Sequence, residues 1–171
     1  MSGTGQGLRA VARVVVQNEA EEILLCRSRN GRSWVPPGGT LEEGEDLVGA
    51  AAREAMEEAG IEVTVGRMLY LQEFRPAGRE EHVIEVAFLA VPRADRPAAG
   101  LVGSRSVIPA GDGERPWRAW YIQDPHGPRR ECRWFSREAL AALSEPVYPP
   151  FLREEFWECG CGEYLGLVRG T

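Results

Sequence analysis

The chain has 171 residues, a formal net charge of −6, 43% hydrophobic residues and 27% charged residues. This length suits one domain with a proper core, and this balance of apolar and charged residues excludes an intrinsically disordered chain. Binding to a nucleic-acid backbone needs a basic surface, so the acidic balance argues against nucleic acid as the main partner.

The first part of the chain predicts two strands. Residues 8–17 and 23–26 are rich in apolar and β-branched side chains and flank the polar segment 18–21, so we predict a β-hairpin. Residues 1–7 lack the basic and apolar regions of a signal peptide, and no apolar run in the chain reaches membrane-spanning length. We therefore expect a cytoplasmic protein with no membrane partner.

A turn and a helix follow at residues 36–60. The Pro-Pro-Gly-Gly sequence at 36–39 predicts a tight turn with exposed backbone. Asp46 is suited to cap the start of the helix, and Gly60 can supply the left-handed residue that ends it. At about 100° per residue, one face of this helix is expected to pack on the core; it holds Val48, Ala52, Ala55, Met56 and Ala59.

The other side of this helix carries a cluster of acids. Glu54, Glu57 and Glu58 stand at i, i+3 and i+4, where like charges repel one another. A purely structural helix would gain by separating them, so we favour a site for a hard divalent cation over a solvated acidic face. Mg²⁺ is usually held by few carboxylates together with substrate phosphates, which implies a phosphate-bearing substrate. Glu45 and Arg53 are expected to orient the cluster.

The spacing of these residues carries a family resemblance. From Gly39, five residues lead to Glu45 and seven more to Arg53-Glu54; Glu57-Glu58 then precede Gly60 and the apolar Ile61. Residues 39–61 thereby resemble the Nudix box at every specified position. The resemblance implies an α/β fold, an α/β/α sandwich with a mixed β-sheet, in a single domain over residues 8–145.

The same resemblance implies a chemistry. It indicates a Nudix hydrolase that uses Mg²⁺ or Mn²⁺ to cleave the diphosphate bond of a nucleoside diphosphate linked to another group. The expected metal ligands are the carbonyl of Gly39 and the carboxylates of Glu54, Glu57 and Glu58. Glu54 is the first candidate for the general base; some relatives instead use a glutamate from a later loop, for which Glu131 and Glu114 are candidates. Glu131 also matches the position of a further metal-site carboxylate.

Beyond residue 61, the sequence predicts further strands followed by two helices. We predict strands at 62–65, 68–74, 83–91, 117–122 and 131–135, a helix at 136–143 capped by Ser136, and a last amphipathic helix at 150–157. Residues 92–116 are rich in Pro, Gly, Ala and Ser and predict a flexible loop or lid. The segment 146–171 is expected to pack on the same domain. We interpret Cys159 and Cys161 as free thiols, because a zinc site needs more ligands.

Substrate signals are sparse. Pro76, fifteen residues beyond Ile61, resembles the ADP-sugar branch of the family, which includes ADP-ribose pyrophosphatases. Arg27, Arg29 and Arg75 are candidates for phosphate contact, since the chain has no lysine. A nucleoside triphosphate pyrophosphatase and a non-catalytic nucleotide-binding module are the alternative functions. The expected partner is a small-molecule nucleotide, and a homodimer is left open.

Overall fold

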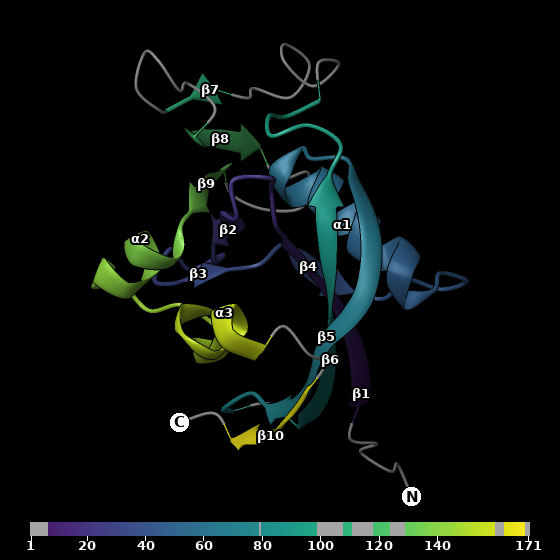
Figure 1. Cartoon of the computed structure of the whole chain (residues 1–171). Coiled ribbons are helices and arrows are strands. Elements are labelled where there is room, and N and C mark those ends of the chain that lie inside the picture. Colours follow the sequence, from purple (N-terminus) through teal and green to yellow (C-terminus); the bar gives the residue numbers. More distant parts are fainter. Residues whose placement is uncertain are drawn as a thin grey trace, which may run out of the picture.

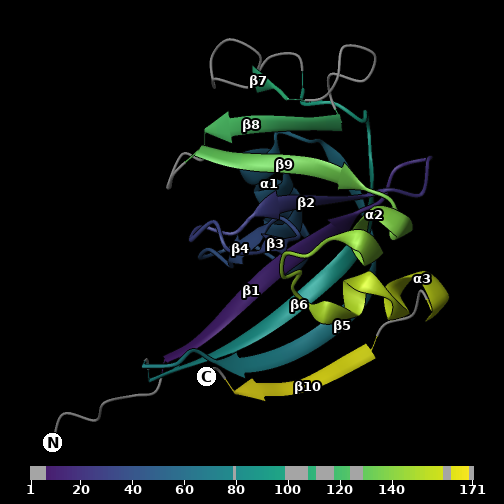
Figure 2. The same ribbon diagram turned by 90° about the vertical axis from the view of Figure 1, so that its left-hand side faces the viewer.

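Two β-sheets lie side by side and form the central layer of the fold (Figures 1 and 2). The computed structural model describes residues 7–78, 80–98, 108–110, 118–123 and 129–158, and the backbone of 159 and 163–169. The first sheet, sheet A, has the order β10 (Glu163–Arg169), β5 (Val63–Arg75), β6 (Glu81–Pro92), β1 (Gly7–Val16), β4 (Gly38–Thr40). The second, sheet B, has the order β3 (Trp34–Val35), β2 (Ile23–Arg27), β9 (Arg129–Phe135), β8 (Ala119–Gln123), β7 (Ile108–Pro109).

Sheet A is mixed and sheet B is antiparallel. Strand β1 runs parallel to β6, and β10 runs parallel to β5, whereas the other pairs of sheet A are antiparallel. Helix α1 (Leu47–Ala59) lies on one side of the two sheets; α2 (Arg137–Ala142), the 3₁₀ helix η3 (Pro150–Arg153) and α3 (Glu155–Cys159) lie on the other (Figures 1 and 2). The predicted α/β/α fold class with a mixed sheet is confirmed.

The predicted hairpin near the N-terminus is wrong, because β1 and β2 belong to different sheets. Their backbones pair only at the isolated antiparallel bridge between Gln17 and Ile23, although side chains of both strands share the same cores. Both edges of β1 are already taken, one by β6 and the other by β4. The polar turn between the strands therefore carries the chain from sheet A to sheet B.

The Pro-Pro-Gly-Gly segment brings the chain back from β3 in sheet B to β4 in sheet A. Gly38 and Gly39 pair with Arg13 and Ala12 of β1. A Cβ atom on Gly38 would lie 2.5 Å from the carbonyl oxygen of Ala12 and 2.8 Å from the Cα of Arg13. Only glycine therefore lets β4 approach the backbone of β1 this closely.

Two hydrophobic cores lie on opposite sides of the sheets, and β1 contributes side chains to both. Val14 and Val16 belong to the core beneath α1, whereas Val15 belongs to the core beneath α2 and η3. The buried face of helix α1 agrees with the predicted one at Ala55 and Ala59, but Val48 is 46% exposed and Ala52 and Met56 are half-buried. Its buried residues are Ala50, Ala51, Glu54, Ala55, Glu58 and Ala59, because the acidic side of the helix is enclosed as well as the alanine side.

Several later elements differ from the sequence pattern. The strands predicted at 62–65 and 68–74 form one strand, β5, with a register shift between Val65 and Met68. The helix predicted at 150–157 is divided into η3 and α3, and β10 was not predicted. Much of the predicted flexible loop at 92–116 lies outside the described residues, as do the thiols of Cys159 and Cys161. In the part of the chain that the structure describes, no helix is long and apolar enough to cross a membrane.

Candidate active site

Helix α1 is fixed at both ends. The side chain of Asp46 accepts a hydrogen bond from the Gly49 N–H at 2.7 Å, and Gly60 ends the helix in the left-handed conformation with φ of 72°. Both predicted caps are confirmed. At the last turn, groups from sheet B donate to helix carbonyls that have no partner within the helix. The Cys132 thiol donates to the carbonyl of Glu58 at 3.2 Å, and the Trp120 indole donates to the carbonyl of Ala59 at 2.9 Å.

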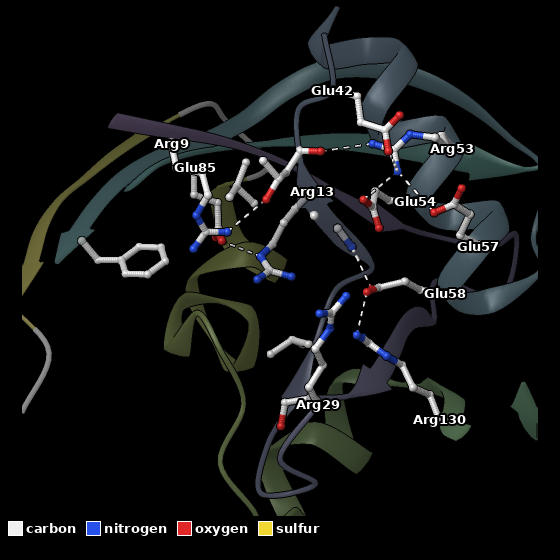
Figure 3. Close-up of a pocket in the computed structure, with 17 residues that line it drawn as sticks. Arg9, Arg13, Arg29, Glu42, Arg53, Glu54, Glu57, Glu58, Glu85 and Arg130 are labelled. Atoms are coloured by element: carbon white, nitrogen blue, oxygen red, sulfur yellow. Dashed lines mark hydrogen bonds and ion pairs between the residues drawn. The ribbon is translucent and has the colours of Figure 1, made fainter. Parts of the chain in front are cut away.

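A cavity of about 540 Å³ opens beside this helix (Figure 3). Its polar wall combines two sets of charged residues from distant parts of the chain. The acids are Glu42, Glu54, Glu57, Glu58 and Glu85, and the bases are Arg9, Arg13, Arg29, Arg53 and Arg130. Gly38, Gly39 and Thr40 of β4 complete the side that faces α1. The structure thus brings together the predicted residues Gly39, Arg53, Glu54, Glu57 and Glu58.

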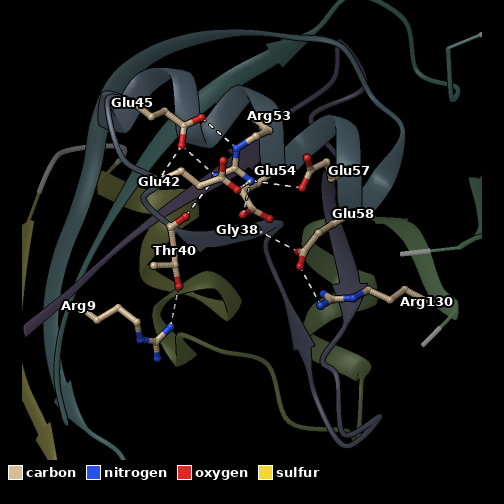
Figure 4. Close-up of polar contacts among 10 residues, drawn as sticks. All are labelled: Arg9, Gly38, Thr40, Glu42, Glu45, Arg53, Glu54, Glu57, Glu58 and Arg130. Atoms are coloured by element: carbon tan, nitrogen blue, oxygen red, sulfur yellow. Dashed lines mark hydrogen bonds and ion pairs between the residues drawn. The ribbon is translucent and has the colours of Figure 1, made fainter. Parts of the chain in front are cut away.

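Arg53 orders the upper part of the acidic cluster (Figure 4). Its guanidinium lies 3.0 Å from Glu45, 2.8 Å from Glu54 and 3.3 Å from Glu57. It also donates to the carbonyl of Thr40 at 3.2 Å, which ties the helix to β4. The hydrogen bonds to Glu45 raise the pKa of Arg53 above its usual range, so this side chain is a permanent cation. The orienting role predicted for Glu45 and Arg53 agrees with these contacts.

Glu58 is buried between α1 and β9. One carboxylate oxygen lies 2.8 Å from Arg130, and the other accepts the Gly38 N–H at 3.1 Å (Figure 4). Burial raises the pKa of Glu58 to about 7, although Arg130 and the Gly38 N–H act in the opposite direction. Burial also raises the pKa of Glu54, against the influence of Arg53. Both carboxylates are therefore costly to ionise without additional positive charge nearby.

The arginines face these acids from three separate elements. Arg9 and Arg13 stand on β1, Arg29 follows β2, and Arg130 belongs to β9. Figure 3 shows Arg13, Arg29 and Arg130 directed toward the space in front of the carboxylates. Arg13 is held by Glu85, whose carboxylate lies 2.5 Å from its Nε atom, and it also donates to the Pro36 carbonyl at 2.9 Å.

The acidic set fits a divalent cation by its chemistry. Carboxylate and carbonyl oxygens are the ligands that Mg²⁺ and Mn²⁺ prefer. The backbone of Gly39 lies against Glu54 so closely that an added Cβ would be 2.2 Å from the Glu54 Oε1 atom. Arg53 contacts both Glu54 and Glu57, whereas Glu58 is engaged by Arg130. No group of three His, Cys, Asp or Glu ligands converges among the described residues.

Four of the predicted site residues lie elsewhere. Glu131 points away from the cavity, and its carboxylate forms ion pairs with Arg133 at 2.6 Å and Arg27 at 3.6 Å. Arg27 stacks on the Trp34 ring, with its guanidinium carbon 4.1 Å from the ring centroid. Arg75 and Pro76 follow the end of β5 and are not among the residues that line the cavity. Glu114 lies outside the described residues.

The structure places Glu131 outside the cavity, because neighbouring strand residues point to opposite faces of a sheet. On β9 it is Arg130 that reaches Glu58, so Glu131 faces the other way. The arginines of β1 and β9 and the acid on β6 were missed. A usable signal existed for two of them, since Arg13 and Glu85 interrupt apolar strands and a charge in such a place needs a partner.

Comparison with known proteins gives a consistent result. A family model described as NUDIX domain matches residues 7–154. Diphosphoinositol polyphosphate phosphohydrolase 2 of Rattus norvegicus is 44% identical over 57 residues, which are 33% of this chain and 32% of the relative. The chain therefore matches about a third of the length of that relative.

Solved structures share the fold at low sequence identity. A NUDIX hydrolase from Nitrosomonas europaea is similar with a TM-score of 0.62 at 16% identity, covering 95% of this chain and 80% of the other. An ADP-ribose pyrophosphatase from Streptococcus suis is similar with a TM-score of 0.54 at 18% identity, covering 94% of this chain and 98% of the other.

Proposed function

Because the chain belongs to the NUDIX family, we propose that it is a hydrolase that cleaves the diphosphate bond of a nucleoside diphosphate linked to another group. One observation carries this proposal. Three carboxylates of one helix face arginines from three other segments across a single cavity. The acids suit a hard cation and the arginines suit phosphate oxygens, so the two sets together suit a phosphate–cation complex.

Mg²⁺ or Mn²⁺ is the cofactor that the donor set fits. The carbonyl of Gly39 and the carboxylates of Glu54, Glu57 and Glu58 would hold it. When bound, such a cation polarises phosphate oxygens and lowers the pKa of water. The positive charge it adds would also offset the cost of ionising Glu54 and Glu58, which burial makes high.

The protein's own groups would position the substrate and take up a proton. Arg13, Arg29 and Arg130 would bind phosphate oxygens and orient the bond to be cleaved. We assign the general base to Glu54, because it lines the cavity whereas Glu131 does not. Arg53 would hold the Glu54 carboxylate in place through its contact at 2.8 Å. The proton of the attacking water would pass to a Glu54 oxygen.

Within this class we propose ADP-ribose or a related nucleotide sugar as the substrate, following the resemblance around Pro76. The sequence relative is named for phosphohydrolysis of diphosphoinositol polyphosphate, another compound with a diphosphate group. This supports cleavage between two phosphates and leaves the attached group to experiment. A nucleoside triphosphate presents the same bond and is the alternative substrate class.

A phosphate-release screen tests the proposal. The protein is assayed with Mg²⁺ and with Mn²⁺, coupled to a phosphatase, on nucleotide sugars including ADP-ribose, dinucleoside polyphosphates, nucleoside triphosphates and a diphosphoinositol phosphate. We expect cation-dependent turnover that Glu54→Gln lowers by at least about 100-fold, in the range of a lost general base. Glu43→Gln is the matched control, since Glu43 is an exposed acid of the same segment outside the cavity. A folded protein that releases phosphate from no compound refutes the hydrolase.

A further inference from the structure

A second cavity, of about 360 Å³, adjoins the first. The two cavities share Arg13, Val35, Phe74 and Glu85 in their walls. The remaining wall of the second cavity is formed by Gln72, Tyr148, Pro149 and Pro150. The first cavity is thus ringed by charges, whereas the second is bounded mainly by rings and aliphatic groups. A ligand that spans both must be ionic at one end and apolar at the other.

Two aromatic residues give the second cavity its character. Phe74 is half-buried near the end of β5 and lines both cavities. Tyr148 is 56% exposed and precedes Pro149 and Pro150, which line the same cavity. A flat ring placed against these side chains would cover exposed apolar surface and stack on aromatic faces. Phosphate groups would lose their hydration against the apolar side chains of this wall, which offers few polar partners besides Arg13, Gln72 and Glu85.

One polar group in this wall has a fixed orientation. The Nε2 atom of Gln72 lies 2.7 Å from the Glu85 carboxylate, which also accepts from Tyr70 at 3.1 Å and pairs with Arg13. A carboxylate paired with arginine can only accept, so the Gln72 amide nitrogen must be the atom that faces Glu85. This orientation leaves the Gln72 amide oxygen, as an acceptor, and the second N–H of the amide, as a donor, for other partners.

We propose that the second cavity binds the nucleobase of the substrate, stacked against Phe74 and Tyr148, with the Gln72 oxygen accepting a hydrogen bond from a donor on the edge of the base. The inference rests on the proposed function, because the phosphates of the same molecule occupy the first cavity. Arg13 and Glu85, which border both cavities, lie where the ribose and first phosphate connect them. The assignment favours nucleotides over inositol phosphates, which have no flat apolar part.

Binding without turnover tests the assignment. A nucleoside 5′-monophosphate and ribose 5-phosphate share their phosphate and sugar and differ by the base, so calorimetry with each in EDTA isolates the base. We expect the nucleotide to bind about 10-fold or more tightly, as stacking of a base on aromatic side chains provides. Tyr148→Ala and Phe74→Ala should each remove most of that ratio, and Tyr148→Ala, which alters the second cavity alone, should leave the affinity for ribose 5-phosphate unchanged.

Gln72 and a control variant complete the design. Gln72→Leu keeps the approximate shape and removes the amide, both its acceptor oxygen and its hydrogen bond to Glu85, and should lower the affinity for the nucleotide about 5-fold. Met68→Ala is the control, since Met68 is exposed on the same strand and lines neither cavity. Tyr148→Ala alters an exposed side chain and should unfold at the wild-type temperature, so a loss of affinity in that variant is not a loss of fold.

Failure of the base site and failure of the proposed hydrolase activity give different results. Equal affinities for the nucleotide and ribose 5-phosphate overturn the base site, even if the phosphate-release screen finds turnover. The base site is also overturned if neither Tyr148→Ala nor Phe74→Ala lowers the affinity for the nucleotide. A base-dependent affinity that falls in both variants supports the site, and if the screen is then silent it is the hydrolase that fails.

Discussion

Gly39→Ala is expected to remove activity while leaving the fold nearly intact. The added Cβ would lie 2.2 Å from Oε1, 2.7 Å from Cδ and 2.9 Å from Oε2 of Glu54. Ordinary contacts between carbon and oxygen exceed 3 Å, so the Glu54 carboxylate must retreat by about 1 Å. A displacement of that size at a reacting group costs about 100-fold in rate. The carboxylate ends a flexible side chain, so a changed rotamer costs only about 1 kcal/mol of stability.

The neighbouring glycine gives the contrast. In Gly38→Ala the new Cβ meets the backbone of Ala12 and Arg13 in β1, so a strand must move and the free energy of unfolding should fall by about 1–3 kcal/mol. Gly7→Ala is the neutral control, because nothing lies within 4 Å of the added atom. The variants are compared by kcat/KM on the best substrate of the screen and by urea denaturation. Wild-type kcat/KM in Gly39→Ala, or a loss of stability equal to that of Gly38→Ala, would refute the reasoning.

Three further predictions concern the charges around the site. Glu131→Gln should keep the wild-type kcat/KM and lose at most about 1 kcal/mol in urea denaturation, because Glu131 pairs with Arg27 and Arg133 outside the cavity; a large fall in kcat would return it to the reaction. Arg53→Lys keeps the positive charge but loses the planar guanidinium that contacts several carboxylates at once, and it should lower kcat about 10-fold at unchanged Tm. Burial raises the pKa of Glu58 to about 7 from 4.5, so its folded form binds a proton more readily than its unfolded form. In EDTA, the contribution of Glu58 to the free energy of unfolding is therefore fully present below pH 4.5 and is lost as pH rises to 7, by about 3 kcal/mol at most. The difference in free energy of unfolding between wild type and Glu58→Gln should change with pH across this window. Parallel pH profiles of the two proteins would contradict the reasoning.

The acidic half of the site could be predicted because it is local. Glu54, Glu57 and Glu58 lie within about one turn of the helix, and the caps at Asp46 and Gly60 belong to the same short segment. In a helix, residues three or four positions apart lie next to each other on the same face, so their proximity can be read from the sequence. The proposed cation chemistry rests on the same residues, and no knowledge of the other strands is needed to infer it.

The basic half could not be predicted because it depends on pairing between distant strands. Arg130 reaches Glu58 only because β9 enters sheet B beside β2, and a register shifted by one residue would present Glu131 instead. Arg9 and Arg13 reach the cavity because β1 lies in sheet A between β6 and β4. A single arginine in a strand has no periodic pattern that identifies its partner. The choice of sheet for β1 and β2 was missed for the same reason.

The charges of the cavity would let an acidic chain bind the anionic substrate that we propose. The chain carries a net charge of −6, yet five glutamates and five arginines line the cavity, so its walls are formally neutral. Arg53 is engaged by three of these acids and Arg130 by Glu58. These ion pairs limit the repulsion within α1 before any cation arrives. A cation without phosphate would then meet arginines, and a phosphate without a cation would meet carboxylates. Because each ligand compensates the charge that opposes the other, the two should bind with positive cooperativity.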